Sequence, residues 1–126
     1  MSENELSKIV VNAAYQVHTE LGAGLLENVY QECLFSEITD AGLKVQKEVV
    51  LPVVYKNKKI ELGYRIDLLV EDKLIIEIKC VDSFMPIHKA QLLTYLKLTN
   101  NKLGLLMNFN VPLIKDGIKR VINGYL

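Results

Sequence analysis

Apolar residues recur with helical spacing over the first forty residues and with strand spacing after them. Leu6, Ile9, Val10, Ala13, Ala14, Val17 and Leu21 predict a helix from about Asn4 to Glu20. It should stop at the Gly22-Ala23-Gly24 segment, because glycine suits a helix C-terminus. A second helix is predicted from about Leu25 to Asp40, ending before Gly42, with a buried stripe of Leu26, Val29, Tyr30, Cys33, Leu34 and Ile38.

The next segments alternate with the period of a β-strand. One strand is predicted from Lys44 to Tyr55, and Pro52 within it indicates an edge position or a bulge because proline lacks the ladder donor. A basic turn, Lys56 to Lys59, follows. We interpret it as the soluble tip of a hairpin in preference to a phosphate contact. Two further strands are predicted, from Ile60 to Val70 and from Leu74 to Val81.

The last two of these strands have a register that their own pattern specifies. A turn of three residues after Val70 pairs Val70 with Leu74 and therefore Asp67 with Glu77. In this register Ile66, Leu68 and Val70 share one face with Leu74, Ile76 and Ile78, while Arg65, Asp67 and Leu69 share the other with Ile75, Glu77 and Lys79. Opposed carboxylates repel each other unless a cation lies between them. Two interpretations stay open: a metal site, or an ordinary hairpin with a solvated charged face.

The C-terminal third predicts a crossover helix and more sheet. A helix should run from Met85-Pro86 to about Thr99, and the buried run Leu103 to Phe109 should lie parallel to the Glu77 strand. The tail from Gly117 to Leu126 is a candidate last edge strand. Gln91 and Tyr95 lie one helical turn apart and either pack the helix or line a site at the strand ends. The expected fold is a single α/β domain over residues 1–126, with a mixed sheet flanked by helices.

Composition narrows the setting of this domain. The 126 residues are 50% hydrophobic and 24% charged, as in globular proteins. The sequence has no long uninterrupted apolar run, so we expect no transmembrane helix. Cys33 and Cys80 lie far apart and are expected to be reduced in a cytoplasmic protein. The 15 basic and 15 acidic residues give zero net charge. Any nucleic-acid contact should therefore depend on a local patch, a bound metal or a partner protein.

Several motifs together resemble a known family. They are Gly24-x-x-Glu27-x-x-Tyr30, Gly63-Tyr-Arg-Ile-Asp67, Glu77-Ile-Lys79, His88-Lys-Ala-Gln91-Leu-Leu-Thr-Tyr95 and Asn108-Phe109. In this order the chain resembles the bacterial GxxExxY family, which is assigned to the PD-(D/E)XK nuclease superfamily, from about Ile9 to Val121. The resemblance implies a PD-(D/E)XK nuclease-like fold.

The resemblance also implies roles for single residues. Asp67 and Glu77 match the superfamily's metal-binding acids, the carbonyl of Ile78 would be a third ligand, and Lys79 matches the lysine that orients or deprotonates the attacking water. Gln91 and Tyr95 resemble a signature that supports the site and contacts the DNA backbone, and Arg65 and His88 are further candidates for that support. Two features depart from the superfamily. Ile66 replaces the proline of its name, and the cysteines of its iron–sulfur branch are absent.

Glu27 keeps two interpretations. It resembles the first-helix acid of related exonucleases, which would make it a further metal ligand, or it only favours the dipole of its own helix.

The expected chemistry is hydrolysis of a phosphodiester bond. Carboxylates can hold Mg²⁺ or Mn²⁺, and such a cation polarises the phosphoryl oxygen and lowers the pKa of bound water. We therefore expect a Mg²⁺- or Mn²⁺-dependent nuclease that acts on nucleic acid, with DNA favoured. The alternative is a catalytically silent scaffold or binding protein with the same fold, including a homodimer formed through the edge near Pro52 or through the tail.

Overall fold

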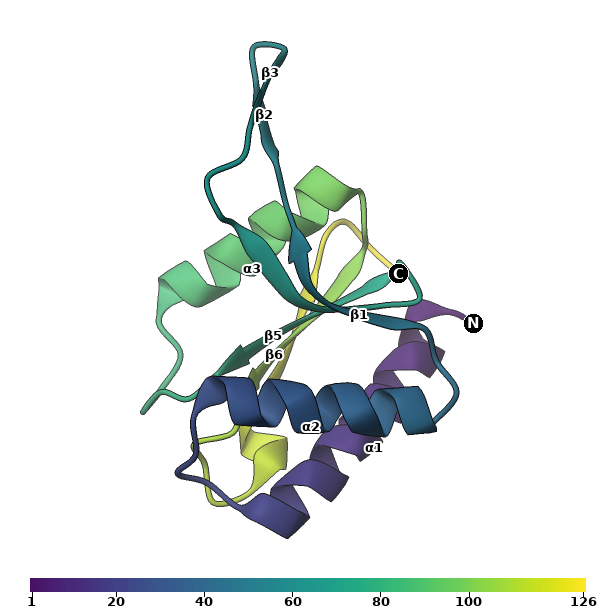
Figure 1. Ribbon diagram of the computed structural model, residues 1–126, viewed down its shortest axis with the longest axis vertical. Coiled ribbons are helices and arrows are strands. Elements are labelled where there is room, and N and C mark those ends of the chain that lie inside the picture. The colour runs from purple at the N-terminus through teal and green to yellow at the C-terminus, as the bar shows by residue number, and fades with distance from the viewer.

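The structure is a computed structural model that describes residues 1–126, and three helices, a 3₁₀ turn and seven strands form it (Figure 1). In chain order these are α1 (Glu3–Leu21), α2 (Glu27–Asp40), β1 (Val45–Val50), β2 (Val53–Tyr55), β3 (Lys58–Ile60), β4 (Arg65–Val70), β5 (Leu74–Lys79), α3 (Pro86–Thr99), β6 (Leu103–Asn108), η1 (Ile114–Gly117) and β7 (Ile118–Ile122). The predicted helices are confirmed to within two residues at each end.

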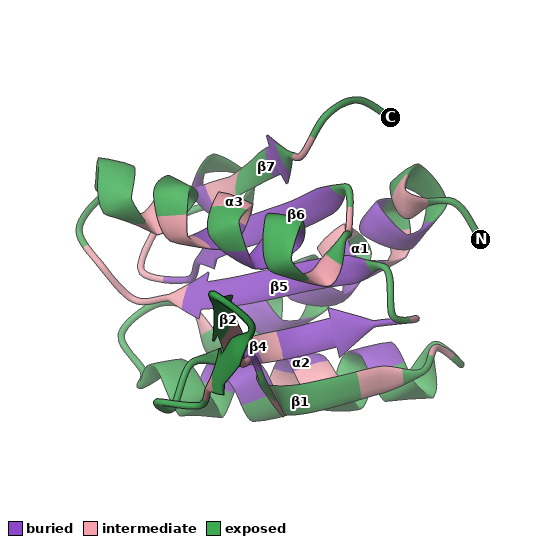
Figure 2. Ribbon diagram, turned by 90° about the horizontal axis from the view of Figure 1, so that it is seen from above, coloured by how far each residue is buried: buried purple, intermediate pink, exposed green.

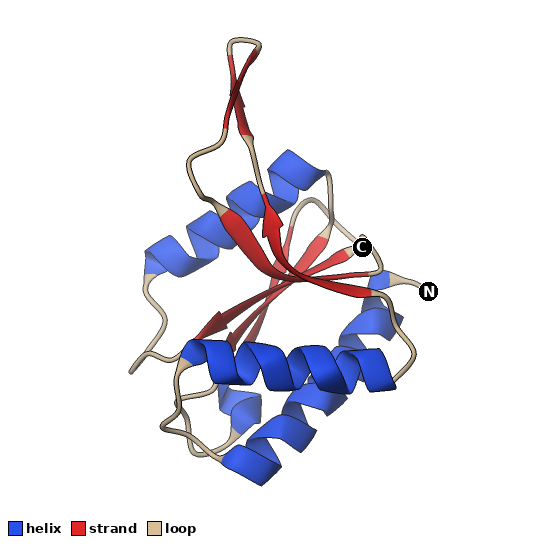
Figure 3. Ribbon diagram, in the orientation of Figure 1, coloured by secondary structure: helices blue, strands red, loops and turns tan.

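Five strands form the central sheet in the order β1-β4-β5-β6-β7. The β5 and β6 strands are parallel and joined by α3, and every other neighbouring pair is antiparallel (Figure 3). The mixed sheet, the parallel crossover and the last strand in the tail are therefore confirmed. The β1 and β7 strands form the two edges, which leaves β4, β5 and β6 inside the sheet.

Helices cover both faces of this sheet (Figure 1). The α1 and α2 helices pack on one face, where Leu68, Val70, Ile76 and Ile78 belong to a cluster with Leu34 of α2. The α3 helix packs on the other face, where Ile75 and Leu106 meet Leu92 and Leu96. Burial of both sheet faces explains the near-continuous apolar runs of β5 and β6.

The predicted stripe of the second helix is wrong at its first two positions. Leu26 is 72% exposed and Val29 is 38% exposed. The helix begins only at Glu27, so Leu26 precedes its first turn. Tyr30 is the residue that packs the start of the helix against the core instead. Its hydroxyl donates to the carbonyl of Gly22 at 2.6 Å, and its ring stacks on Phe109 at a centroid distance of 4.5 Å.

Two predicted strands are each divided in the structure. The predicted strand Lys44–Tyr55 breaks into β1 and β2 at Pro52, and the predicted strand Ile60–Val70 breaks into β3 and β4. The β2 and β3 strands pair only with each other and form a hairpin, residues 53–60, that projects from the sheet and is largely exposed (Figure 2). We call this hairpin the finger. Lys56 and Asn57 form its tip with φ angles of 46° and 64°, which confirms the predicted turn.

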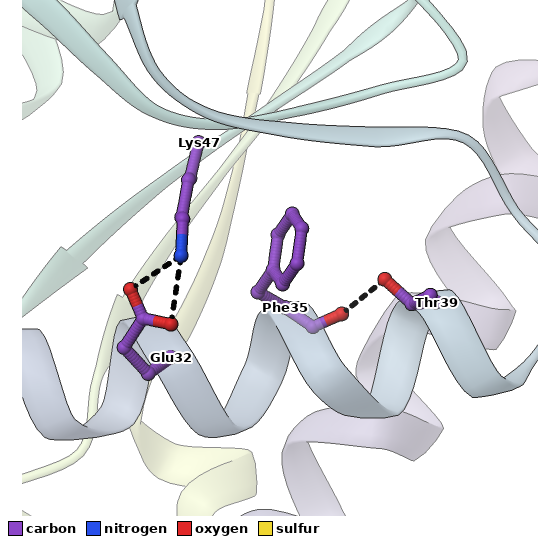
Figure 4. A network of polar contacts seen from close by, with 4 residues as sticks. All are labelled: Glu32, Phe35, Thr39 and Lys47. Atoms are coloured by element: carbon purple, nitrogen blue, oxygen red, sulfur yellow. Dashed lines mark hydrogen bonds and ion pairs between the residues drawn. The ribbon is translucent and has the colours of Figure 1, made fainter.

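An ion pair fixes α2 beneath the edge strand β1 (Figure 4). The Nζ atom of Lys47 lies 2.8 and 2.9 Å from the two carboxylate oxygens of Glu32 and also stands 4.8 Å from the ring centroid of Phe35. The hydroxyl of Thr39 donates to the carbonyl of Phe35 within the same helix, at 2.8 Å. Lys47 is therefore committed to α2 and does not neutralise the acids of β4 and β5.

None of the helices combines the length and the hydropathy that crossing a bilayer requires. Cys33 and Cys80 are both free and partly buried.

Candidate active site

The β4–β5 hairpin has the register that the sequence predicts. Val70 pairs with Leu74, Leu69 with Ile75 and Leu68 with Ile76. The regular pairing ends there, one position before Asp67 and Glu77. Beyond it the main-chain N–H of Asp67 donates to Glu77 Oε2 at 2.8 Å, and the N–H of Ile78 donates to Asp67 Oδ2 at 2.8 Å. Each carboxylate thus takes a ladder bond from the other strand, and the two acids stand together where the strands separate.

The predicted alternation of faces is wrong at Ile66. This side chain belongs to the cluster on the α3 face together with Leu69, whereas Leu68 belongs to the opposite cluster. The cause is a local distortion beside Asp67. On the neighbouring strand, regular pairing skips Glu48, whose φ angle is 52°, between the pairs of Lys47 and Val49. A left-handed residue on the neighbouring strand interrupts the pleat there, so Ile66 and Leu68, on either side of Asp67, face opposite sides of the sheet, whereas a regular strand would put them on one side.

Burial is the main cause of the raised pKa values of this acid pair. It raises the pKa of Glu77 to about 8, with repulsion from Asp67 as the second cause, and it also raises the pKa of Asp67. The main-chain N–H bonds and the positive charge of Lys79 oppose both shifts. The salt bridges of the chain all lie elsewhere. No ion pair within the protein therefore stabilises the ionised form of either acid.

The second oxygen of each carboxylate is open to a ligand. Asp67 Oδ1 and Glu77 Oε1 take no hydrogen bond from the protein. No fully buried side-chain nitrogen or oxygen lacks a hydrogen-bond partner, so both of these oxygens reach solvent. Carboxylate oxygens that reach solvent can bind a cation or accept the N–H and O–H groups of a substrate.

Glu27 lies at the same end of the sheet. Its Oε2 accepts the main-chain N–H of Cys80 at 3.1 Å, immediately after Lys79. Its charge also raises the pKa of both Asp67 and Glu77. Glu27 therefore does more than favour the dipole of its own helix, although α2 does start with it.

Glu48 is a fourth acid that the sequence analysis missed. It is exposed on β1, and its charge contributes to the raised pKa of Asp67. The β1–β4 register places Glu48 opposite Asp67, between the pairs Lys47 with Leu68 and Val49 with Ile66. Aligning the apolar positions of the first predicted strand with those of the second would have found it.

Asn108 holds the chain segment that follows Lys79. Lys79 ends β5 and pairs with Asn108 of β6, which is 2% exposed. The Asn108 amide donates to the carbonyl of Val81 at 2.8 Å, and its oxygen accepts the N–H of Val81 at 3.2 Å and that of Asn110 at 3.0 Å. This buried amide therefore fixes the backbone on which the lysine stands.

Tyr95 reaches the acid pair from α3. It is 5% exposed, and burial raises the pKa of its hydroxyl to about 12, with further contributions from Glu77 and Asp67. The ring of Tyr64 meets it edge-on at 6.5 Å. Both tyrosines line a groove of about 320 Å³, the apolar groove, whose other lining residues are Leu51, Val53, Ile87, Ala90, Gln91, Thr94 and Leu98. Gln91 and Tyr95 thus share one face, as predicted, and that face adjoins the acids.

Two predicted support residues have other contacts. The Nδ1 atom of His88 accepts the main-chain N–H of Met85 at 3.0 Å, and the ring meets Phe84 edge-on, so His88 caps the start of α3. Arg65 is exposed at the first position of β4 and forms no salt bridge. The structure therefore does not bring these two side chains into the acid cluster.

The donors suit a hard divalent cation in an open site. No three histidine, cysteine, aspartate or glutamate side chains are gathered into a preformed metal cluster. Mg²⁺, however, is usually held by one or two carboxylates and completes its shell with waters and substrate phosphate oxygens. The free oxygens of Asp67 and Glu77, in a pair with raised pKa, meet that requirement.

Comparisons with known proteins assign the chain to a family. The family model described as the PD-(D/E)XK nuclease superfamily matches residues 4–121. The chain belongs to the PD-(D/E)XK nuclease superfamily, and the nucleases of this superfamily typically use divalent metals. No curated protein matches the chain.

One solved structure shows the same fold. It is described as "Crystal structure of SSO0001", is 24% identical in sequence and superposes with a TM-score of 0.52. The match covers 98% of this chain and 60% of that protein, so the chain spans well under two thirds of the length of that relative.

Proposed function

We propose that the protein is a Mg²⁺- or Mn²⁺-dependent nuclease that hydrolyses phosphodiester bonds of DNA. The observation that carries this proposal is the Asp67–Glu77 pair. Glu77 is buried and Asp67 partly buried, neither forms a salt bridge, and one oxygen of each acid is open to solvent. Superfamily membership makes nucleic acid the expected partner. In this proposal Asp67 and Glu77 hold the cation, with the carbonyl of Ile78 and the carboxylate of Glu27 as further ligands.

A bound divalent cation would supply charge neutralisation at the phosphoryl oxygens and a water of lowered pKa. The protein residues do the rest. The two main-chain N–H bonds orient Asp67 and Glu77 so that their free oxygens face outward. Lys79 follows Glu77 on the same face of β5 and offers an amine that can orient the attacking water and stabilise negative charge on the phosphate.

Tyr95 and Gln91 support this arrangement from the other side of the site. The high pKa of Tyr95 keeps its hydroxyl protonated at neutral pH, so that it can donate a hydrogen bond toward a phosphate. Gln91 lies one turn earlier on α3 and lines the same groove. Both residues would position the substrate and are not expected to carry the proton transfer.

The motif Gly24-x-x-Glu27-x-x-Tyr30 supports a closer assignment to the GxxExxY family. Gly24 has a φ angle of 101°, Glu27 reaches the main chain after Lys79, and Tyr30 closes the linker between α1 and α2. All three residues thus act on the start of α2, which carries the acid. The free thiols of Cys33 and Cys80 support the cytoplasmic location that we propose.

A cleavage assay tests this function. The wild-type protein should degrade labelled DNA in Mg²⁺ or Mn²⁺ and not in EDTA. Lys79→Met should lower the rate by at least 100-fold, since general acid–base groups contribute about 10²–10⁴-fold. Asp67→Asn should lower it at least as much, because it removes a ligand of the cation. Glu37→Gln, on the exposed face of α2, is the matched control and should cleave at the wild-type rate. No metal-dependent cleavage of single- or double-stranded DNA or RNA would contradict the proposal and favour the catalytically silent scaffold.

A further inference from the structure

The charges of the chain are separated between the two faces of the sheet. The α1 and α2 helices carry seven carboxylates and one lysine, namely Glu3, Glu5, Glu20, Glu27, Glu32, Glu37 and Asp40 against Lys8. The finger and α3, by contrast, contain no acidic residue and carry Lys56, Lys58, Lys59, Lys89 and Lys97, of which Lys59 pairs at 3.4 Å with Glu61, the residue that follows the finger. The zero net charge therefore conceals an acidic helical layer and a basic finger and α3.

The apolar groove opens on this basic face. Its walls are α3 on one side and the end of β1, the start of the finger and Tyr64 on the other. Several large apolar side chains in and beside it are exposed, namely Val54 at 63%, Tyr55 at 58%, Leu62 at 80%, Tyr64 at 48%, Ile87 at 64% and Leu98 at 42%. The finger rises beside α3 (Figure 1), with Lys56 in its turn and Lys58 and Lys59 on β3. Exposed aromatic and aliphatic groups flanked by cations are unusual on a surface that meets only water.

From this surface we propose that the finger and the apolar groove together bind single-stranded DNA. In this arrangement unpaired bases lie in the groove against the ring of Tyr64, and the backbone phosphates run along Lys56 and Lys58 of the finger, which form no salt bridge. The path of the strand toward the acids rests on the proposed nuclease function, since Tyr95 belongs to both the groove and the acid site. The strand would thereby deliver a phosphodiester to Asp67 and Glu77.

The chemistry of the groove favours an unpaired strand over a duplex. A single strand presents apolar base faces together with its phosphates, and binding sites for it combine stacking aromatic rings with a positive track. A duplex hides its base faces and offers only phosphates and groove edges, which would leave the exposed Tyr64 and Ile87 without partners.

The same chemistry favours DNA over RNA and over a protein. Most of the groove lining is carbon, which gives little to hydrogen-bond the 2′-hydroxyl groups that RNA presents. The absence of acidic residues on the finger and α3 matches a polyanion better than a second copy of this chain, whose face would carry the same positive charge.

Equilibrium binding in EDTA tests the inference separately from cleavage. Fluorescence anisotropy would compare a labelled oligodeoxythymidylate with a hairpin duplex and with an oligouridylate of equal length. The single-stranded DNA should bind at least tenfold more tightly than either of the others. Tyr64→Ala should weaken single-strand binding by about tenfold, because stacking of one base contributes ~1–3 kcal/mol. Tyr125→Ala, at a residue 85% exposed near the C-terminus, is the control and should bind as the wild type does.

The salt dependence tests the role of the finger. Replacing Lys56 and Lys58 by glutamine should lower the slope of log K against log salt by about 1.4, since each phosphate contact to a single strand contributes about 0.7. The matched control replaces Lys8 and Lys115, which lie away from the finger, and should leave the slope unchanged.

Several outcomes would overturn the inference. They are duplex or RNA binding as tight as single-stranded DNA binding, unchanged affinity of Tyr64→Ala, or a dimer in light scattering that Tyr64→Ala dissociates. Single-strand binding with the expected losses but without cleavage in Mg²⁺ would support the inference and contradict the proposed nuclease. Cleavage without a preference for single-stranded DNA would support the proposed nuclease and contradict the inference.

Discussion

At the residue scale, Asp67 and Glu77 each do two things. One oxygen of each acid accepts a main-chain N–H group that the separating strands leave without a carbonyl partner. The other oxygen reaches solvent. Because burial raises both pKa values, and repulsion from Asp67 raises that of Glu77 further, the pair is costly to the metal-free protein at neutral pH. A site that is unfavourable when empty gains more from a bound cation than a neutral surface would.

This cost predicts how the stability of the metal-free protein depends on pH. Glu77 titrates near 4.5 when unfolded and at about 8 when folded, so the folded protein binds more protons between these values. The free energy of unfolding should therefore fall as pH rises from about 4.5 to 8, by on the order of a few kcal/mol. Urea denaturation in EDTA across this range would measure the slope.

Glu77→Gln supplies the comparison for that slope. Its amide oxygen can still accept the N–H of Asp67 but cannot ionise, so the variant should lose most of the decline. Glu37→Gln, at an exposed position of α2, should keep it. A wild-type protein whose stability rises over this pH range would show that the acids are not buried as the structure has them.

Sequence alone could predict the residues of the pair but not their surroundings. The apolar pattern of β4 and β5 is strong enough to fix the register, because a slip of one residue would bury Glu77 and Lys79 among Ile66 and Leu68. The distortion at Glu48 could not be foreseen, since a glutamate is an uncommon choice for a positive φ angle. The reversed face of Ile66 follows from that distortion.

At the scale of elements, η1 fixes the end of β6 near the site. A Cβ atom added to Gly117 would lie 2.1 Å from the carbonyl oxygen of Asn108, so glycine is required there by close approach of two backbones. Asn108 in turn bonds both sides of the main chain at Val81. The 3₁₀ turn, the end of β6 and the segment after Lys79 therefore form one packed unit.

Two alanine substitutions test this unit. Gly117→Ala should lower the free energy of unfolding by about 2 kcal/mol or more, because the carbonyl it meets is backbone and cannot move aside. Gly104→Ala should cost less, about 1 kcal/mol, because its nearest contacts at 2.8–2.9 Å are side-chain atoms of Leu92. Urea unfolding of both variants measures the difference. Equal costs would contradict the close approach at Gly117.

The finger is the element that the sequence pattern mispredicted, because strand alternation continues through it. Pro52 signalled a break, but no local rule tells whether the chain beyond it stays in the sheet or leaves it. In the structure the last link to the sheet is the bond from the N–H of Leu51 to the carbonyl of Tyr64 at 2.9 Å. The hairpin beyond makes no pair with the central sheet.

The domain should therefore tolerate removal of the finger. Val53 and Ile60 are cross-strand partners, so an Asn-Gly turn can join them in place of residues 54–59. The free energy of unfolding of the shortened protein should lie within about 1 kcal/mol of the wild-type value, because the deleted residues are exposed. Circular dichroism with urea titration is the measurement. A protein that no longer folds would show that the finger supports the core.

At the scale of the whole molecule, charge is organised across the sheet although its sum is zero. The acidic layer of α1 and α2 would repel a polyanion, and the basic finger and α3 would attract it to the side where Tyr64 and Tyr95 lie. The net charge of the sequence, taken alone, counted against nucleic-acid binding. The net charge was misleading because it does not record which charged residues share a face of the molecule. The fold determines that arrangement.

The central claim is that Asp67 and Glu77 form a divalent metal site, and manganese titration calorimetry tests it most directly. The wild-type protein should bind Mn²⁺, Glu37→Gln should bind it equally well, and Asp67→Asn and Glu77→Gln should each lose at least tenfold in affinity, ~1.4 kcal/mol. No Mn²⁺ binding by the wild-type protein, or undiminished binding by both site variants, would contradict the claim.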